Sequence, residues 1–223
     1  MAPAVSLRAA VALLGQFPVL AGVDLDVEEG SVAAVLGPNG AGKTSLLFLV
    51  AGLLPMRSGT GRVLGCDLFG DRRDLRQKVG LLGHSPALYP ELSATENLSF
   101  GLRAMRRPVA DARAALERVG LTGRLATTPA RTLSAGQSRR MGLAWLLARR
   151  PALWLLDEPH AGLDVPGRDL CDDVIEQAAL GGATVLLTSH DPERAAKVSN
   201  QVVQLAGGAV VAASDGQRSP RVA

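Results

Sequence analysis

Aromatic side chains are scarce in this chain: Phe, Trp and Tyr together make up 3% of its 223 residues. Proteins that bind single-stranded nucleic acid without sequence preference need a row of aromatic rings on which bases stack, so this class is disfavoured. A strong charge of either sign is also lacking, since the net charge is only +3. So mild a positive charge does not by itself indicate a nucleic-acid partner.

Cysteine and long apolar runs are also in short supply. The only two cysteines, Cys66 and Cys171, lie far apart, and isolated thiols of this kind fit a reducing compartment. A membrane-spanning helix needs about 20 apolar residues, whereas the longest uncharged apolar run, 46–56, is interrupted by Pro55. We therefore expect a cytosolic chain, and any membrane role would need partner subunits.

Apolar residues are ordinary in amount, at 47%, and their pattern alternates between strand and helix. Residues 23–27 alternate between apolar and acidic, which is typical of a half-buried strand. Short continuous apolar runs predict buried parallel strands, and Gly207-Gly208 predicts a hairpin. The predicted buried strands are 31–36, 153–156 and 184–188, and a helix is predicted over 43–54. This order predicts a doubly wound, mostly parallel α/β sheet.

The middle of the chain differs in composition. Residues 85–150 are rich in Arg and Ala and have helical periodicity, with helix stops at Pro108, Gly120 and Gly123. We interpret them as a helical lobe inserted into the α/β core of a single domain that spans residues 1–223. The polar tail, 214–223, is predicted to be flexible.

A glycine-rich segment lies between the predicted strand at 31–36 and the helix at 43–54. Glycines let the backbone turn tightly, so that N–H groups point at phosphate oxygens beside the positive end of the helix. In such a phosphate-binding loop the lysine reaches the β- and γ-phosphates and the threonine hydroxyl ligates Mg²⁺. The predicted nucleotide-binding residues are Gly37, Pro38, Asn39, Gly40, Ala41, Gly42, Lys43, Thr44 and Ser45. The sequence therefore predicts ATP and Mg²⁺ as ligands.

Two acidic residues end the predicted strand at 153–156, at the edge where open α/β sheets bind ligands. Asp157 suits coordination of Mg²⁺, directly or through water. Glu158 suits a general base that activates the attacking water. A solvated acidic pair is the alternative, and the phosphate loop in the same chain argues against it.

His190 ends the strand predicted at 184–188. Its side chain could donate to the γ-phosphate or orient the attacking water. A lone histidine at a strand end is more often structural, but the preceding strand and the order along the chain favour function. The predicted catalytic residues are Glu158, His190 and Lys43.

A second candidate anion site precedes a helix that runs to about Arg150. It consists of Leu133, Ser134, Ala135, Gly136 and Gln137. Ser134 suits an N-cap, and its hydroxyl, the Gly136 amide and the helix end together attract an anion. Because one γ-phosphate site already exists, we interpret this one as gripping ATP bound to a second subunit. A simple helix cap is the alternative.

In this order along the chain, the motifs resemble the nucleotide-binding domain of ABC ATPases. The matching segments are 37–44, 133–137, 155–159, 161–164 and 188–190. The resemblance implies a P-loop NTPase fold with a parallel-sheet core, an antiparallel β subdomain and an inserted helical lobe. It further implies a head-to-tail homodimer in which each ATP lies between the phosphate loop of one copy and residues 133–137 of the other. Asp164 would lie at that interface.

The same resemblance implies ATP hydrolysis coupled to transport. Integral membrane permease subunits would be the partners, and the chain would be peripheral on the cytoplasmic face of the membrane. It would bind neither nucleic acid nor cargo directly.

Three positions depart from the family pattern. His84 occupies the place of a glutamine in the loop between the lobes; an imidazole can hold a water near Mg²⁺, with a charge that depends on pH. Leu14 aligns with the aromatic residue that normally stacks on adenine, and Phe17 is out of register. Losing that stack would lower ATP affinity about tenfold or more. Ala135 replaces a commoner glycine.

Within the family, the chain most resembles the ATP-binding subunit of the haem exporter used in cytochrome c maturation. The similar segments are 83–86, 91–98, 138–140 and 152–159. The chain itself offers no haem ligands, because His84, His160 and His190 are too scattered. An export ATPase for another cargo, such as a drug, lipid or polysaccharide, stays open as an alternative.

Other classes fit less well. ABC ATPases that act on DNA place long coiled coils between the phosphate loop and the signature, but here fewer than ninety residues separate Thr44 and Leu133, without sustained heptads. Ribosome-associated members carry two nucleotide domains in one chain. A non-hydrolysing regulator is kept open by His84 and Leu14, and the retained catalytic residues argue against it.

Overall fold

The computed structural model describes residues 3–84 and 86–218. The chain forms two compact units, which are described separately. The core unit comprises Met1–Leu81, Pro151–Glu158 and Ile175–Ala223, and the helical unit comprises Leu82–Arg150 and Pro159–Val174. In the part of the chain that the structure describes, every helix is too short or too polar to cross a membrane.

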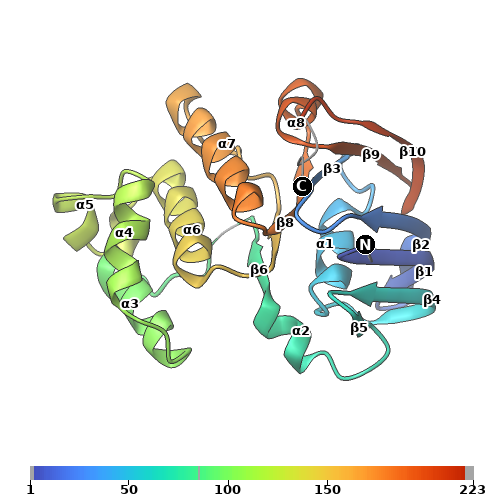
Figure 1. Cartoon of the computed structure of the whole chain (residues 1–223), viewed down its shortest axis with the longest axis horizontal. Coiled ribbons are helices and arrows are strands. Elements are labelled where there is room, and N and C mark those ends of the chain that lie inside the picture. Colours follow the sequence, from blue (N-terminus) through green and yellow to red (C-terminus); the bar gives the residue numbers. More distant parts are fainter. Residues whose placement is uncertain (1–2, 85, 219–223) are drawn as a thin grey trace. The chain divides into compact units, whose positions relative to one another are not determined.

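The first sheet of the core unit is antiparallel, with strand order β2-β1-β4-β5. Its strands are β1 (Val5–Leu14), β2 (Phe17–Val27), β4 (Met56–Val63) and β5 (Cys66–Asp67) (Figure 1). Burial alternates along the second half of β2, so the apolar side chains of Val23, Leu25 and Val27 face the core. This confirms the half-buried strand predicted there and the antiparallel subdomain.

The second sheet has strand order β10-β9-β3-β8-β7-β6. The strands are β3 (Val32–Leu36), β6 (Val79–Leu82), β7 (Leu153–Leu156), β8 (Thr184–Ser189), β9 (Gln201–Ala206) and β10 (Ala209–Asp215). Strand β3 pairs in parallel with β8 and β9, and β7 pairs in parallel with β8. Every residue of β3, β7 and β8 is buried, as expected for strands of a parallel sheet. The predicted α/β fold class is therefore confirmed, as is the β9–β10 hairpin.

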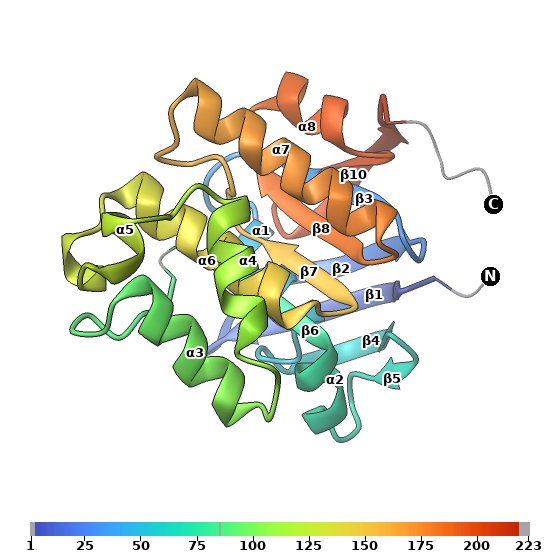
Figure 2. The same ribbon diagram turned by 60° about the vertical axis from the view of Figure 1, so that its left-hand side comes forward.

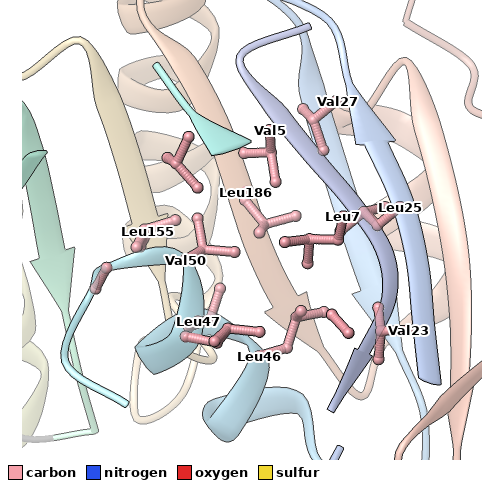
Figure 3. Close-up of a cluster of buried hydrophobic side chains, with 14 of the residues drawn as sticks. Val5, Leu7, Val23, Leu25, Val27, Leu46, Leu47, Val50, Leu155 and Leu186 are labelled. Carbon is pink, nitrogen blue, oxygen red and sulfur yellow. The ribbon is translucent and has the colours of Figure 1, made fainter. Parts of the chain in front are cut away.

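Helix α1 (Lys43–Val50) joins the two sheets through one hydrophobic core (Figure 3). Its contribution comes from Leu46, Leu47 and Val50, which are fully buried. Around them pack buried side chains of both sheets: Val5, Leu7, Val23, Leu25, Val27, Leu155 and Leu186. Each buried aliphatic side chain contributes about 1.5–3 kcal/mol relative to exposure, so this core fixes the strand ends that carry the site.

Helix α1 is shorter than predicted, because the sequence analysis extended it to Leu54. Gly52 adopts the left-handed conformation, with φ of 68°. The amides of Leu53 and Leu54 then bond back to the Phe48 carbonyl, at 2.9 and 3.0 Å, and the helix ends. Glycine commonly ends helices in this way, and the apolar residues beyond it hid the stop.

The helical unit contains the helices that Figure 2 shows in green and yellow. They are α3 (Ala94–Ala104), α4 (Ala110–Arg118), α5 (Arg124–Thr127), a short 3₁₀ helix (Ala130–Thr132) and α6 (Ala135–Arg149). A Cβ on Gly101 of α3 would lie 2.5 Å from the Trp145 ring of α6, so this glycine permits close helix packing. The unit also includes Pro159–Val174, which the sequence analysis had left in the core.

Three further helices complete the fold: α2 (Arg73–Lys78), α7 (Val165–Leu180) and α8 (Pro192–Val198). At the C-terminal end, Ser214 and Asp215 belong to β10 and pair with Val202 and Gln201. Residues 219–223 lie outside the described residues. The flexible tail and the assignment of residues 1–223 to one functional domain stay predictions.

Candidate functional site

The phosphate loop connects β3 to α1 in the core unit. Its Gly42 has φ of 102°, and a Cβ there would lie 2.6 Å from the Val19 carbonyl oxygen, so glycine is required. No side chain caps α1, which leaves the N–H groups of its first turn for a bound anion. Pro38, Asn39 and Gly40 are exposed at the tip of the loop.

Lys43 is the buried cation of this loop. Only 8% of its surface is exposed, and its Nζ donates to the carbonyl oxygens of Gly37 and Pro38, at 2.7 and 3.3 Å. The ammonium group therefore lies against the backbone carbonyls of the loop. A phosphate held by the loop amides would meet this charge directly.

A chain of hydroxyl–carboxylate hydrogen bonds links the loop to the ends of two strands. Thr44 Oγ1 donates to Asp157 Oδ2 at 2.9 Å, and Thr188 Oγ1 donates to Asp157 Oδ1 at 2.7 Å. The backbone N–H of Glu158 donates to Thr188 Oγ1 at 3.0 Å. Asp157 is thereby held next to Thr44, and both present oxygen atoms, the ligand type that Mg²⁺ prefers.

Glu158 and His190 form the second group of the site. Glu158 Oε2 lies 2.7 Å from His190 Nδ1 and accepts the backbone N–H of His190 at 3.2 Å. The other oxygen, Oε1, lies 3.9 Å from Lys43 Nζ. Glu158 has φ of 48°, an uncommon backbone conformation that often accompanies functional sites. The structure thus brings together the three residues predicted to be catalytic.

Thr188 is the site residue that the sequence analysis missed. It is fully buried in β8, and its one hydroxyl connects Asp157 to the Glu158 backbone. The available signal was a hydroxyl side chain at the end of an otherwise apolar strand, where a buried threonine needs a hydrogen-bond partner.

The candidate signature lies in the helical unit, at the start of α6. Ser134 is the N-cap: the Gln137 N–H donates to Ser134 Oγ at 3.2 Å, and the Ser134 N–H donates to Gln137 Oε1 at 2.9 Å. This is a capping box. Ser134 and Ala135 are exposed. A Cβ on Gly136 would lie 3.0 Å from the Gly162 carbonyl oxygen, so a side chain there would crowd the turn that precedes α7.

Asp164 and His84 also lie in the helical unit. Asp164 Oδ1 accepts the Gly167 N–H at 3.1 Å, so its carboxylate caps α7. His84 is exposed and lines a hollow of about 430 Å³ together with Pro86, Ser138 and Arg139. Both residues belong to the helical unit, whereas Lys43, Thr44, Asp157, Glu158 and His190 belong to the core unit.

Leu14 and Phe17 face each other at the end of the β1–β2 hairpin. Both are exposed, at 66% and 79%. Residues paired across an antiparallel ladder share one face, so Phe17 presents its ring on the same face as Leu14. Phe17, which is out of register with the usual aromatic position in the sequence, is therefore the cross-strand partner of Leu14, which occupies that position.

The fold and the site define a phosphate-loop ATPase. A family model described as ABC transporter matches residues 20–161, which is more than half of the chain. The chain therefore belongs to the ABC transporter family, and it is an enzyme that couples ATP hydrolysis to transport.

The curated relatives refine this family assignment. A cytochrome c biogenesis ATP-binding export protein CcmA from Rhodopseudomonas palustris (strain BisB18) is 44% identical over 78% of this chain and 85% of its own length. The protein of the same name from Bradyrhizobium diazoefficiens is 40% identical, over 82% and 90%. The nucleotide-binding ABC ATPase resemblance inferred from the sequence is confirmed, as is its similarity to the cytochrome c maturation subunit.

Solved structures support the fold. The ATP-binding cassette MJ0796, solved as a dimer with ADP and Pi, has a TM-score of 0.87 and 24% identity over 95% of this chain and 98% of that one. The cbiO1 protein from Clostridium perfringens, part of the ABC transporter complex cbiONQ, has a TM-score of 0.83 and 26% identity over 96% and 89%.

Proposed function

We propose that this chain is the ATP-binding and hydrolysing subunit of a membrane exporter that serves haem export or delivery in cytochrome c biogenesis. The observation that carries the catalytic part is the Glu158–His190 pair, held at 2.7 Å beside Lys43. The biological role is supported by the similarity to cytochrome c biogenesis export proteins at 40–44% identity.

ATP binding starts at the phosphate loop. The loop amides and the first turn of α1 hold the phosphates, and Lys43 neutralises their charge. Thr44 and Asp157 would hold Mg²⁺, whose oxygen preference they match. When bound, Mg²⁺ supplies positive charge against the terminal phosphates of ATP.

Hydrolysis needs a base and an oriented water. Glu158 accepts a proton from the attacking water. At the same time the oxygen of this water forms a bond to the γ-phosphorus, and the bond between that phosphorus and the ADP oxygen breaks. His190 positions the Glu158 carboxylate through its ring and its backbone amide. A positioned general base is typically worth about 10²–10⁴ in rate.

The helical unit supplies the other side of each ATP. Two copies pair head to tail, and residues 133–137 of one copy contact the ATP held by the other, with Asp164 at the interface. Exposure of Ser134 and Ala135 at the N-terminus of α6 supports this role, because that helix end is open to an incoming phosphate. His84 takes the place of the glutamine that the family resemblance implies.

The membrane part of the function belongs to permease subunits. We place the chain on the cytoplasmic face of the membrane, bound through these partners. Closure of the ATP-bound dimer and its opening after hydrolysis would drive them.

The test is a mild-detergent purification of the tagged chain from its native membranes, with mass spectrometry and an absorbance spectrum. Polytopic partners with a haem Soret band are expected. Polytopic partners without haem would overturn the haem assignment and leave an exporter of another cargo. Nucleic acid or ribosomes in place of membrane proteins would overturn the transport role itself. An Arg113→Gln bait, altered at an exposed residue whose ion pair is with Glu117 on the same helix, is the matched control.

A further inference from the structure

Asn97 is a buried polar side chain on α3 that bonds to one short loop. Only 7% of its surface is exposed. Its Oδ1 accepts the Tyr89 N–H at 2.8 Å. Its Nδ2 donates to the carbonyl oxygens of Tyr89, Leu92 and Ser93, at 3.1, 2.9 and 3.0 Å. Both ends of the amide are engaged, so the side chain defines the path of residues 89–93.

The same loop is bonded to the segment directly ahead of the signature. The Ala130 N–H donates to the Leu92 carbonyl at 2.8 Å, and the Arg131 N–H donates to the Pro90 carbonyl at 3.0 Å. The Leu92 carbonyl thus accepts from both Asn97 and Ala130. The Leu133 N–H bonds back to Ala130 at 3.1 Å, and Ser134 then begins α6. Figure 2 shows α3 and α6, the helices that directly follow Tyr89–Ser93 and residues 130–134 in the chain.

Capping of α3 does not explain these bonds. Ser93 already caps the helix through its hydroxyl, in a capping box with Glu96. Three of the four Asn97 bonds go to Tyr89 and Leu92, outside the helix. The amide therefore ties α3 to the loop, and through the loop to the start of the signature.

We propose that Asn97 is a positioning residue for the signature: it holds the Tyr89–Ser93 loop, and this loop sets the position of Leu133–Gln137. The inference rests on the proposed role of these residues in gripping the ATP of a second copy. It predicts that Asn97 governs ATP-driven pairing of two copies, and leaves untouched the first binding of ATP at the phosphate loop, which lies in the other unit.

The experiment compares Asn97→Asp with Thr95→Val, both in a Glu158→Gln chain that binds ATP without turning it over. The aspartate keeps the size of the side chain but turns a donor into an acceptor facing three carbonyls. Thr95→Val is the matched control, because Thr95 lies on the same helix and loses one bond, to the Ala126 carbonyl at 2.9 Å, away from the Leu92–Ala130 contact. Fluorescent ATP-analogue titration measures binding by the monomer, and analytical ultracentrifugation with ATP measures pairing.

We expect Asn97→Asp to weaken ATP-dependent pairing about tenfold or more, the equivalent of about one net hydrogen bond, with analogue affinity within about twofold. Thr95→Val should change both by less than threefold. Equal pairing by Asn97→Asp and its parent would overturn this inference alone. A parent that stays monomeric with ATP would overturn the proposed in-trans role, and this inference with it.

Hydrogen exchange of the monomer gives a second measurement. The amides of Ala130 and Arg131 should exchange faster in Asn97→Asp than in Thr95→Val, and unchanged exchange there would contradict the proposal. Should Asn97→Asp fail to fold, Asn97→Ser, which keeps one donor, takes its place in both measurements.

Discussion

The candidate residues of the core unit and those of the helical unit use their hydrogen-bonding groups differently. In the core unit, Thr44 and Thr188 both donate to Asp157, and Glu158 bonds to His190. In the helical unit, the side chains of Ser134 and Asp164 accept hydrogen bonds that cap their own helices. The side chains of the first group are therefore held by one another, whereas those of the second group are held at the N-termini of their own helices.

This difference matches the two proposed roles, ATP hydrolysis in the core unit and pairing of two copies through the helical unit. A site that breaks a phosphoryl bond needs its base and cation preorganised, and the core unit provides both. A surface that grips a phosphate on another copy needs only a well-formed helix terminus. Substitutions in the core unit should therefore change binding or hydrolysis by one chain, and substitutions at the signature should change pairing.

The largest expected effect comes from Glu158→Gln. An amide cannot take the proton from water, so ATP hydrolysis should fall about 10²–10⁴-fold, while ATP binding persists and the closed dimer accumulates. A phosphate-release assay with ATP-dependent size analysis measures both. Glu176→Gln, at an exposed position on α7, is the control. Wild-type turnover by Glu158→Gln would show that Glu158 is not the base.

Lys43→Ala should come next. It removes the buried ammonium that would meet the phosphates, and a charge-assisted bond of this kind is worth about 1.5–3 kcal/mol, so ATP affinity should fall about 100-fold. Binding at micromolar ATP would then be lost, as equilibrium dialysis would detect. Lys78→Ala removes an exposed lysine of the same unit and should leave affinity unchanged. Unchanged affinity in Lys43→Ala would contradict the phosphate-loop assignment.

Ser134→Ala tests the helical side of the comparison. Loss of the cap should cost about 1 kcal/mol of stability, leave ATP binding by the monomer unchanged, and weaken ATP-dependent pairing about tenfold. Ser93→Ala removes the equivalent cap from α3. It should cost similar stability, but pairing should change by less than threefold, because Asn97 still holds the Ser93 carbonyl. Equal losses of pairing in the two variants would show that Ser134 acts only as a helix cap.

The sequence indicated which core-unit residues would lie together, because each lies in or next to a segment that follows a buried strand. Glycine spacing and apolar runs are local signals, and they indicated Lys43, Asp157, Glu158 and His190 before any contact was known. Thr188 escaped because its role depends on a hydroxyl reaching across to a neighbouring strand.

Asn97 escaped for the same kind of reason. Its partners are the backbone groups of a loop up to eight residues away, and no periodicity signals them. The early end of α1 at Gly52 also went unnoticed, because Leu53 and Leu54 continued the apolar pattern. What the sequence could not supply were hydrogen bonds that follow no periodicity, whether across strands, as at Thr188, or to backbone a few residues away, as at Asn97 and Gly52.

The smallest effect should come from surface ion pairs, which lie outside both sites. In the core unit, Arg8 donates to both carboxylate oxygens of Asp26, at 3.0 and 2.6 Å, and this hydrogen bonding lowers the pKa of Asp26 below its ordinary value of 3.8. A lowered pKa stabilises the fold above the ordinary value, and the stabilisation disappears as the pH falls through the lowered one. Because the Asp26 side chain is 42% exposed, the Arg8–Asp26 pair contributes only about 0.5 kcal/mol.

Asp26→Asn should therefore lose about 0.5 kcal/mol of unfolding free energy at pH 7, and the difference from wild type should vanish as the pH drops below about 3.8. Glu117→Gln, which breaks the more exposed Arg113–Glu117 pair of the helical unit, should lose no more than this at pH 7. Denaturant unfolding at several pH values measures both. Similar small losses would mean that surface charge does not distinguish the two units. A loss above about 2 kcal/mol for either pair would show that surface ion pairs, as well as the buried site residues, make the two units different.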